Sequence, residues 1–417
     1  MKEAYRIIPV YAGDVSGVAS ALYELGGMVV MHDPSGCNST YNTHDEVRWY
    51  RKESYIFISG LNTRDAVLGN DDKFMEDIVA AATGLSPAPK FIALCNSPIP
   101  FLNGTDFRGI ARLLEKRLQI PVFYVKTNGM HDYVDGAGRA FACFANRMLP
   151  RSCEKVASLD PVRINLLGMT PLDFADYQNV ENLKKQLERA GFTLVANWSY
   201  GSSFDEVMTS GQADVNLVLS ATGLPLAQKL RELYGQSYVI GLPLGSLAKV
   251  LYENIKKAAR GEAYCVNPAL ELLSGEDREE DKTLYLIGEA VSAKSLAYHY
   301  VKDLGFHRAV VLCPLEGSKE LISPETGDLL TEGEEDLEEF FKDKKNVSIL
   351  CDPLYRPILP SGAKIYEYPS LSFSGRIFGE HVQGGTGGRE QGQTHLRSNR
   401  YRQGMDVAEV GEDGQCG

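Results

Sequence analysis

A short run of apolar residues, 28–31, leads directly into a turn and then to a cysteine, Cys37. The turn contains Pro34 and Gly36, two residue types that favour turns. An unbroken apolar run bounded by turn residues is typical of a strand that is buried in a parallel sheet. We therefore expect Cys37 just beyond the carboxyl end of such a strand, where open α/β sheets bind their ligands.

The same pattern recurs at residues 91–95, an apolar run that ends in Cys95 and is followed by Asn96, Ser97 and Pro98. Two thiols at the same end of one sheet are a candidate metal or iron–sulfur site, because thiolates are soft ligands. The alternative is that each cysteine fills space in the core, since free cysteine is one of the most commonly buried residue types. For either thiol taken alone, core packing is the simpler interpretation.

Short apolar runs alternate with amphipathic stretches along the chain, and this alternation starts anew twice. It predicts an α/β fold of three doubly wound, Rossmann-like parallel-sheet domains around a central cleft. The expected domains are residues 1–155, which carry both cysteines, 156–275 and 276–380. Residues 6–11 are expected to form a first strand or strand-like entry. Residues 381–417 are rich in glycine, glutamine and charge, and we expect them to be a disordered tail.

The 417-residue chain carries a formal net charge of −12, which argues against nucleic-acid and anionic-membrane partners. The sequence has no apolar run of about 18 residues, and its first residues lack the apolar core of a signal peptide. The expected location is the cytoplasm, where the eight cysteines would be reduced. The sequence has no Walker A motif, so ATP, where it is used, must bind to another protein.

Around the two cysteines the sequence resembles the nitrogenase component 1 type oxidoreductases, which include nitrogenase subunits and related reductases of tetrapyrrole synthesis such as protochlorophyllide reductase. The family's His-Gly-Pro-x-Gly-Cys turn resembles residues 32–37, and its Glu-x-Asp-Val-Val-Phe-Gly-Gly segment resembles residues 63–70. Its Cys-Pro-x-x-x-Ile-Gly-Asp-Asp segment resembles residues 95–106, with a longer spacing. Further motifs in the second and third units extend the resemblance to about residue 380.

Two departures from the family pattern bear on the cofactors. Nitrogenase subunits carry a first cluster cysteine just before a Tyr-Ala-Gly stretch, but here Pro9 and Val10 precede Tyr11. Nitrogenase also ligates its active-site cofactor through a cysteine after an Asn-Leu-Val-His strand, where this chain has Ser220. The resemblance therefore implies no FeMo-cofactor, and an organic substrate near Ser220 in its place.

The resemblance implies a [4Fe–4S] cluster whose metal ligands in this chain are Cys37 and Cys95. Such a cluster usually takes four cysteines, so it would be shared between the subunits of a homodimer, or of a heterodimer with a paralogous chain. The chain would be the catalytic component of an oxidoreductase. An ATP-dependent iron-protein reductase would supply electrons to a small-molecule substrate such as a tetrapyrrole. The alternative is a non-catalytic scaffold that binds or assembles a cofactor or metal cluster.

Other side chains are open to two interpretations. His32 could bind a metal, or it could satisfy backbone groups in its turn, which is the more common role. Cys313 and Cys351 also end predicted strands and could form a second site. They lack a turn like that at Cys37, so we expect core thiols. The segment 48–51 (Arg-Trp-Tyr-Arg) could line a substrate or partner surface, or be a solvated helix face.

Overall fold

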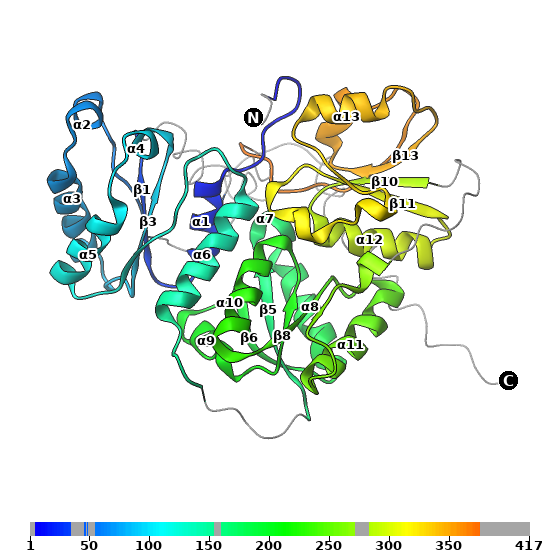
Figure 1. The fold of residues 1–417 in the computed structure, drawn as a ribbon, viewed down its shortest axis with the longest axis horizontal. Coiled ribbons are helices and arrows are strands. Elements are labelled where there is room, and N and C mark those ends of the chain that lie inside the picture. The colour runs from blue at the N-terminus through cyan, green and yellow to red at the C-terminus, as the bar shows by residue number, and fades with distance from the viewer. Residues whose placement is uncertain are drawn as a thin grey trace, which may run out of the picture.

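The structure is a computed structural model, and it describes residues 5–34, 46, 48, 55–153, 160–271 and 283–375. Cys37, residues 49–51 and the expected tail lie outside the described residues. Figure 1 shows three α/β units: the first is blue to cyan, the second green, and the third yellow to orange. None of the described helices is long and apolar enough to cross a lipid bilayer.

The first unit is built on a four-stranded sheet with the strand order β2-β1-β3-β4. Its strands are β1 (Met28–His32), β2 (Tyr55–Ile58), β3 (Ile92–Asn96) and β4 (Val122–Tyr124). The two strands that lead to the predicted thiols are parallel neighbours, and Met31 pairs with Cys95 in the ladder. Every residue of β1 and β3 is buried, as the unbroken apolar runs predict.

The helices that flank this sheet are α1 (Asp14–Leu22), α2 (Thr63–Leu68), α3 (Asp71–Gly84), α4 (Pro98–Leu102), α5 (Phe107–Leu118) and α6 (Tyr133–Met148). Alternate side chains of a strand face opposite sides of the sheet. Val29, Met31 and Cys95 therefore pack in the core with α1 and α6. Val30 and Leu94 pack on the other side, with α3 and α5.

The second unit has a five-stranded sheet with the order β6-β5-β7-β8-β9. Its strands are β5 (Arg163–Met169), β6 (Thr193–Ser199), β7 (Val215–Val218), β8 (Ser237–Ile240) and β9 (Cys265–Val266). Its helices are α7 (Pro171–Phe174), α8 (Tyr177–Arg189), α9 (Phe204–Met208), α10 (Leu224–Tyr234) and α11 (Gly245–Ala259).

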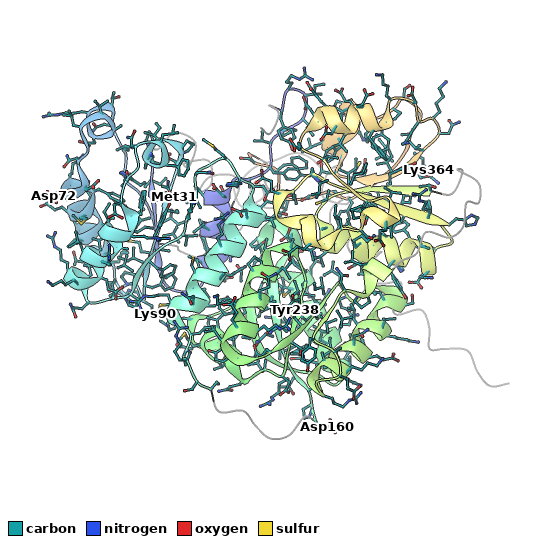
Figure 2. All side chains as sticks on the ribbon, viewed as in Figure 1. Met31, Asp72, Lys90, Asp160, Tyr238 and Lys364 are labelled. Carbon is teal, nitrogen blue, oxygen red and sulfur yellow. The ribbon has the colours of Figure 1, made fainter. Side chains whose placement is uncertain are left out.

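The third unit has a five-stranded sheet with the order β12-β11-β10-β13-β14. Its strands are β10 (Thr283–Ile287), β11 (Arg308–Cys313), β12 (Leu329–Leu330), β13 (Ser348–Cys351) and β14 (Lys364–Glu367), and its α-helices include α12 (Ala290–Lys302) and α13 (Glu334–Phe341). Figure 2 labels Met31, Tyr238 and Lys364, one residue from each of the three sheets.

All strand pairs of the three sheets are parallel. The predicted fold class, with three Rossmann-like parallel sheets, is confirmed. The sheets lie within residues 28–124, 163–266 and 283–367. The exact domain bounds of the sequence analysis stay a prediction.

The three units are joined by shared packing. One hydrophobic cluster contains buried side chains from all of them, for example Val29, Leu226 and Leu284. Figure 1 shows α1 and α6 packed side by side between the first sheet and the second unit. Gly136 of α6 lies at this crossing, where an added Cβ would overlap the backbone carbonyl of Asp14 in α1. The two helices can approach this closely because Gly136 has no side chain.

The N-terminal segment does not form the strand expected at residues 6–11. The backbone N–H groups of Arg6, Ile7 and Ile8 donate to the carboxylate of Glu334, with N···O distances of 2.7–3.1 Å. Tyr11 makes only an isolated antiparallel bridge with Phe373. The segment therefore binds to the third unit, and Figure 1 shows it beside α13. The expectation failed because a distant carboxylate, rather than a neighbouring strand, accepts these hydrogen bonds.

Candidate functional site

Cys95 is the described member of the predicted thiol pair. It lies near the carboxyl end of β3, is completely buried, and its Sγ is 3.5 Å from the carbonyl oxygen of Val30. Burial, with smaller contributions from the charges of Asp14 and Asp33, raises the pKa of the Cys95 thiol well above its usual value. The free thiol is therefore neutral, and only a bound metal would deprotonate it.

The described residues supply one of the two predicted cluster ligands. Among them, no group of three or more His, Cys, Asp or Glu side chains could hold a metal ion. Cys95 alone does not make a cluster site, and the second ligand, Cys37, lies outside the part of the chain that is described. The cluster therefore stays a prediction. Cys313 and Cys351 are buried in separate parts of the core, as expected for core thiols.

His32, at the end of β1, contacts side chains with its ring, whereas the sequence analysis favoured a role in satisfying backbone groups. Its Nδ1 lies 2.8 Å from Ser59 Oγ, and its ring stacks on Phe74 with a centroid distance of 3.9 Å. Burial lowers the pKa of His32 to about 4, against a smaller opposing effect of the Asp33 charge. The imidazole is therefore neutral near pH 7.

Because His32 is buried in its neutral form, we expect the free energy of unfolding to fall in acid. The unfolded chain binds a proton at His32 near pH 6.5 and the native chain only near pH 4, so protonation between these values favours unfolding. The wild-type protein should lose about 3 kcal/mol over this interval from His32 alone. In denaturant titrations from pH 7 to pH 4, His32→Gln should show a shallower loss of stability. The exposed His307 provides the matched control, His307→Gln, which should follow the wild type. Equal slopes for all three proteins would contradict the assignment.

A cleft of about 610 Å³ lies between the second and third units. Figure 1 shows α12 on the side of the third unit that faces the second. Residues within four positions of the ends of β5, β7, β8 and β10 line this cleft, so it lies at the carboxyl ends of the strands, as expected for this fold class. The lining residues are Asp173, Phe174, Asn179, Leu183, Leu219, Ser220, Leu242, Pro243, Leu244, Glu289, Ser292, Leu296, His299, Tyr300, Leu304, Leu350, Ile365, Tyr366, Glu367 and Tyr368.

One face of α12 runs along the cleft. Glu289, which caps the helix, and Ser292, Leu296 and His299 are three or four residues apart and all line it. The helical rise places Glu289 and His299 at opposite ends of this face, about 15 Å apart. His299 Nδ1 is 2.6 Å from the carboxylate of Asp303, which fixes the orientation of the ring.

Two acids lie at the end of the cleft where α12 begins. The Tyr133 hydroxyl donates to Asp173 Oδ1 at 2.6 Å, and the Thr170 hydroxyl donates to Asp173 Oδ2 at 2.9 Å. Glu289 accepts hydrogen bonds from the backbone N–H groups of Ala221, Val291 and Ser292, each at 2.9 Å. Burial, and next the charge of Glu289, raise the pKa of Asp173 to about 7.

A chamber of about 30 Å³ adjoins this acidic end of the cleft. Asp173, Glu289, Ser292 and Tyr368 line both spaces. The other chamber residues are Tyr11, Tyr133, Ile287, Gly288, Asp352, Tyr355, Pro369, Ser370, Ser372 and Phe373. The N-terminal segment and α6 thus bring first-unit side chains to a site built mainly by the other two units.

A polar pocket of about 490 Å³ lies beside His32 in the first unit. Its wall includes Asp65, which is already paired with Lys73 at 3.0 Å, and the exposed residues Val67 and Leu68. The cleft between the second and third units is larger and has more apolar walls, which are the usual features of a small-molecule site.

A family model described as Nitrogenase component 1 type Oxidoreductase matches residues 16–263. The chain belongs to this family. Relatives include the nitrogenase iron-molybdenum cofactor biosynthesis protein NifE of Clostridium pasteurianum, which is 22% identical over 306 residues, 68% of this chain and 63% of that protein. The nitrogenase molybdenum-iron protein alpha chain of Azospirillum brasilense is 22% identical over 287 residues, 64% of this chain and 58% of that protein. The nitrogenase-like chain thus spans less than two thirds of the length of either relative.

The solved structures support the same fold. The structure described as nitrogenase Cp1 at pH 6.5 matches with a TM-score of 0.62 and 17% sequence identity, over 89% of this chain and 88% of that chain. A second one, nitrogenase Cp1 at pH 5, matches with a TM-score of 0.54 and 17% identity, over 80% of this chain and 69% of that chain. At these identities the likeness establishes the fold of the nitrogenase-like chain and not its reaction.

The structure separates the residues that the sequence analysis singled out. Ser220 lines the cleft of this nitrogenase-like chain, whereas Cys95 lies in the first sheet, outside the lining of the cleft. Arg48 is buried and pairs with Glu46 at 2.7 Å, so it is not a solvated surface residue. The sequence analysis missed Asp173 and Glu289. Each comes within a few residues of the end of a predicted strand, which is the signal that had drawn attention to the cysteines.

Proposed function

We propose that the chain is the catalytic component of a nitrogenase-like oxidoreductase that reduces an organic small molecule in the cleft. An ATP-dependent iron protein would supply the electrons. The observation that carries this proposal is the cleft itself: an apolar space at strand carboxyl ends, with the half-buried Asp173 and the buried Glu289 at one end. Its volume of about 610 Å³ is within the usual range for small-molecule sites.

The surroundings of Ser220 favour an organic occupant over a metal cluster. The Ser220 hydroxyl is buried, donates to the carbonyl oxygen of Gly168 at 2.7 Å, and lies 2.6 Å from the Thr222 hydroxyl. A hydroxyl is a poor ligand for soft metals, and this one is already engaged by protein groups. This agrees with the expectation that no FeMo-cofactor binds here. Isolation of the protein with a molybdenum–iron cofactor at Ser220 would contradict it.

Electron entry is proposed at the thiol pair of the first unit. Cys37 and Cys95 would hold a [4Fe–4S] cluster together with ligands from a second chain, either another copy or a paralogue. When bound, such a cluster supplies one-electron transfer. The family membership and the thiol near the end of β3 support this proposal.

A second candidate function is a non-catalytic scaffold that holds a cofactor or cluster precursor. The similarity to a cofactor biosynthesis protein of Clostridium pasteurianum favours it. The two functions differ in turnover. A reductase should convert a bound substrate when an iron protein and ATP are added, whereas a scaffold should release its cargo unchanged to a recipient protein.

Occupation of the cleft can be tested with a tetrapyrrole probe such as protoporphyrin IX. The wild-type protein should bind the probe and quench its fluorescence. Leu296→Trp places a larger side chain in the cleft and should weaken binding by about tenfold or more. Leu113→Trp, on the exposed side of α5, is the matched control and should bind like the wild type. Equal binding by both variants, or no binding by the wild type, would contradict a tetrapyrrole in this cleft.

A further inference from the structure

We propose that Asp173 is the proton donor to the substrate in the cleft, and that the adjoining chamber returns the proton to it. This inference rests on the proposed function, because a reduction that adds hydrogen needs a proton for each electron. Asp173 is half-buried and lines both spaces, so one carboxyl group can face the substrate and the chamber together.

The two acids differ in whether their hydrogen-bond partners can also accept a proton. Burial raises the pKa of Glu289, and the three backbone N–H groups that it accepts oppose this by stabilising its carboxylate form. Asp173 is held by hydroxyl groups, those of Tyr133, Thr170 and Ser220. A hydroxyl can accept a hydrogen bond as well as donate one, so these partners tolerate a protonated Asp173. The pair therefore places the negative charge on Glu289 and the proton on Asp173.

The groups that face Asp173 come from each surrounding element. They are Tyr133 of α6, Thr170 after β5, Ser220 after β7 and Glu289 before α12. Glu289 is the charged one, and it acts with burial to raise the pKa of Asp173 to about 7. An acid with a pKa near the working pH can both give and regain a proton, as a general acid must.

The chamber has the size and lining of a proton-return path. A volume of about 30 Å³ is enough for a water molecule, and the lining offers polar partners to hold it. Tyr133 lines this space, and the hydroxyls of Tyr11 and Tyr355 lie 2.5 Å apart on its wall. Hydroxyls and waters in series can pass a proton without any heavy atom having to move far.

Each electron that reaches the substrate is accompanied by one proton from Asp173. The one-electron reductant of the proposed function reduces the substrate, and the O–H bond of Asp173 breaks as a bond forms between that proton and the substrate. Asp173 is then a carboxylate beside the Glu289 carboxylate, which destabilises it. It takes a proton back from water in the chamber, and the solvent restores that proton.

The first test measures the protonation state of Asp173 in the full-length protein without substrate. Infrared spectra of protein with ¹³C-labelled aspartate should show a protonated-carboxyl band that titrates with a midpoint near pH 7. Asp173→Asn should remove this band. Asp176→Asn is the matched control: it changes a helix-capping aspartate outside the cleft lining and should keep the band. Burial also raises the pKa of Asp14 to about 6, so a band with that lower midpoint is expected in every variant. A band with a midpoint near pH 7 that persists in Asp173→Asn, or a wild type that lacks one, would overturn the proposal.

Two further variants test the cause of the shift. Tyr133→Phe removes a donor to the carboxylate and should raise the midpoint, whereas Glu289→Gln removes the neighbouring charge and should lower it. Equal midpoints in both variants would contradict the assigned pair. Folding of each variant is checked by circular dichroism. A pair of opposite shifts cannot arise from a general loosening of the site.

The second test measures turnover with an iron protein and ATP. Asp173→Asn should bind protoporphyrin IX with an affinity within about threefold of that of the wild type. Its rate of substrate reduction should be lower than that of the wild type by about 100-fold or more. Wild-type rates in Asp173→Asn would overturn the proton-donor role alone. A wild-type protein that binds the probe but never reduces a substrate would overturn the proposed function, while the infrared titration would still report on Asp173.

Discussion

Replacement of Cys95 by alanine is expected to remove the iron–sulfur cluster from the anaerobically purified protein. Cys95 lies near the end of β3, beside the strand that leads to Cys37. A shared cluster that loses one of its thiolates no longer has a full ligand set. Iron content and visible absorbance should therefore fall to background, while the far-ultraviolet circular dichroism of the protein should be unchanged.

The chain offers a matched control for this experiment. Cys351 is also completely buried at the end of a parallel strand, and removal of its thiol changes the core to a similar extent. Cys351→Ala should keep full iron, and both variants should lose only about 1 kcal/mol of stability. Cys37→Ala should behave like Cys95→Ala. Full iron in either of these two variants would show that the cluster is held elsewhere.

Replacement of Gly136 by alanine is expected to have the largest effect on stability. An added Cβ would overlap the backbone of Asp14, and backbone cannot move aside as the end of a flexible side chain can. Overpacking usually costs about 1–3 kcal/mol, and a clash between two helix backbones belongs at or above the upper end of this range. Denaturant titrations should show a loss of about 3 kcal/mol or more, because α1 and α6 must separate.

Gly84 provides the control for this prediction. It is the last residue of α3, and an added Cβ there would meet no atom within 4 Å. Gly84→Ala should be neutral or slightly stabilising, since alanine restricts the unfolded chain more than glycine does. If Gly136→Ala were as stable as Gly84→Ala, the close packing of α1 against α6 would be wrong.

The sequence predicts the sheets better than the contacts between units. Residues 28–31 and 91–95 form neighbouring parallel strands, because fully buried strands must be apolar along their whole length. The strand expected at residues 6–11 is absent from the described structure, because Glu334 accepts its backbone hydrogen bonds from more than 320 residues away. No local pattern in the first ten residues reveals that partner.

The sequence predicts the position of the site, but not the charge states of its acids. Ser220 lines the cleft, as expected from its position after a strand. Asp173 and Glu289 follow strands in the same way, but their charge states depend on burial and on each other, more than 100 residues apart. Only the fold brings these two carboxyl groups and the Tyr133 hydroxyl to one end of the cleft.

The shared cluster is the central claim, and native mass measured together with iron and acid-labile sulfide tests it most directly. The anaerobic protein should carry one [4Fe–4S] cluster per pair of chains, which is about four iron atoms, whether the second chain is a copy or a paralogue. The cluster absorbance should travel only with the species that has the mass of two chains. A species with the mass of a single chain and a full complement of iron and sulfide would contradict the account.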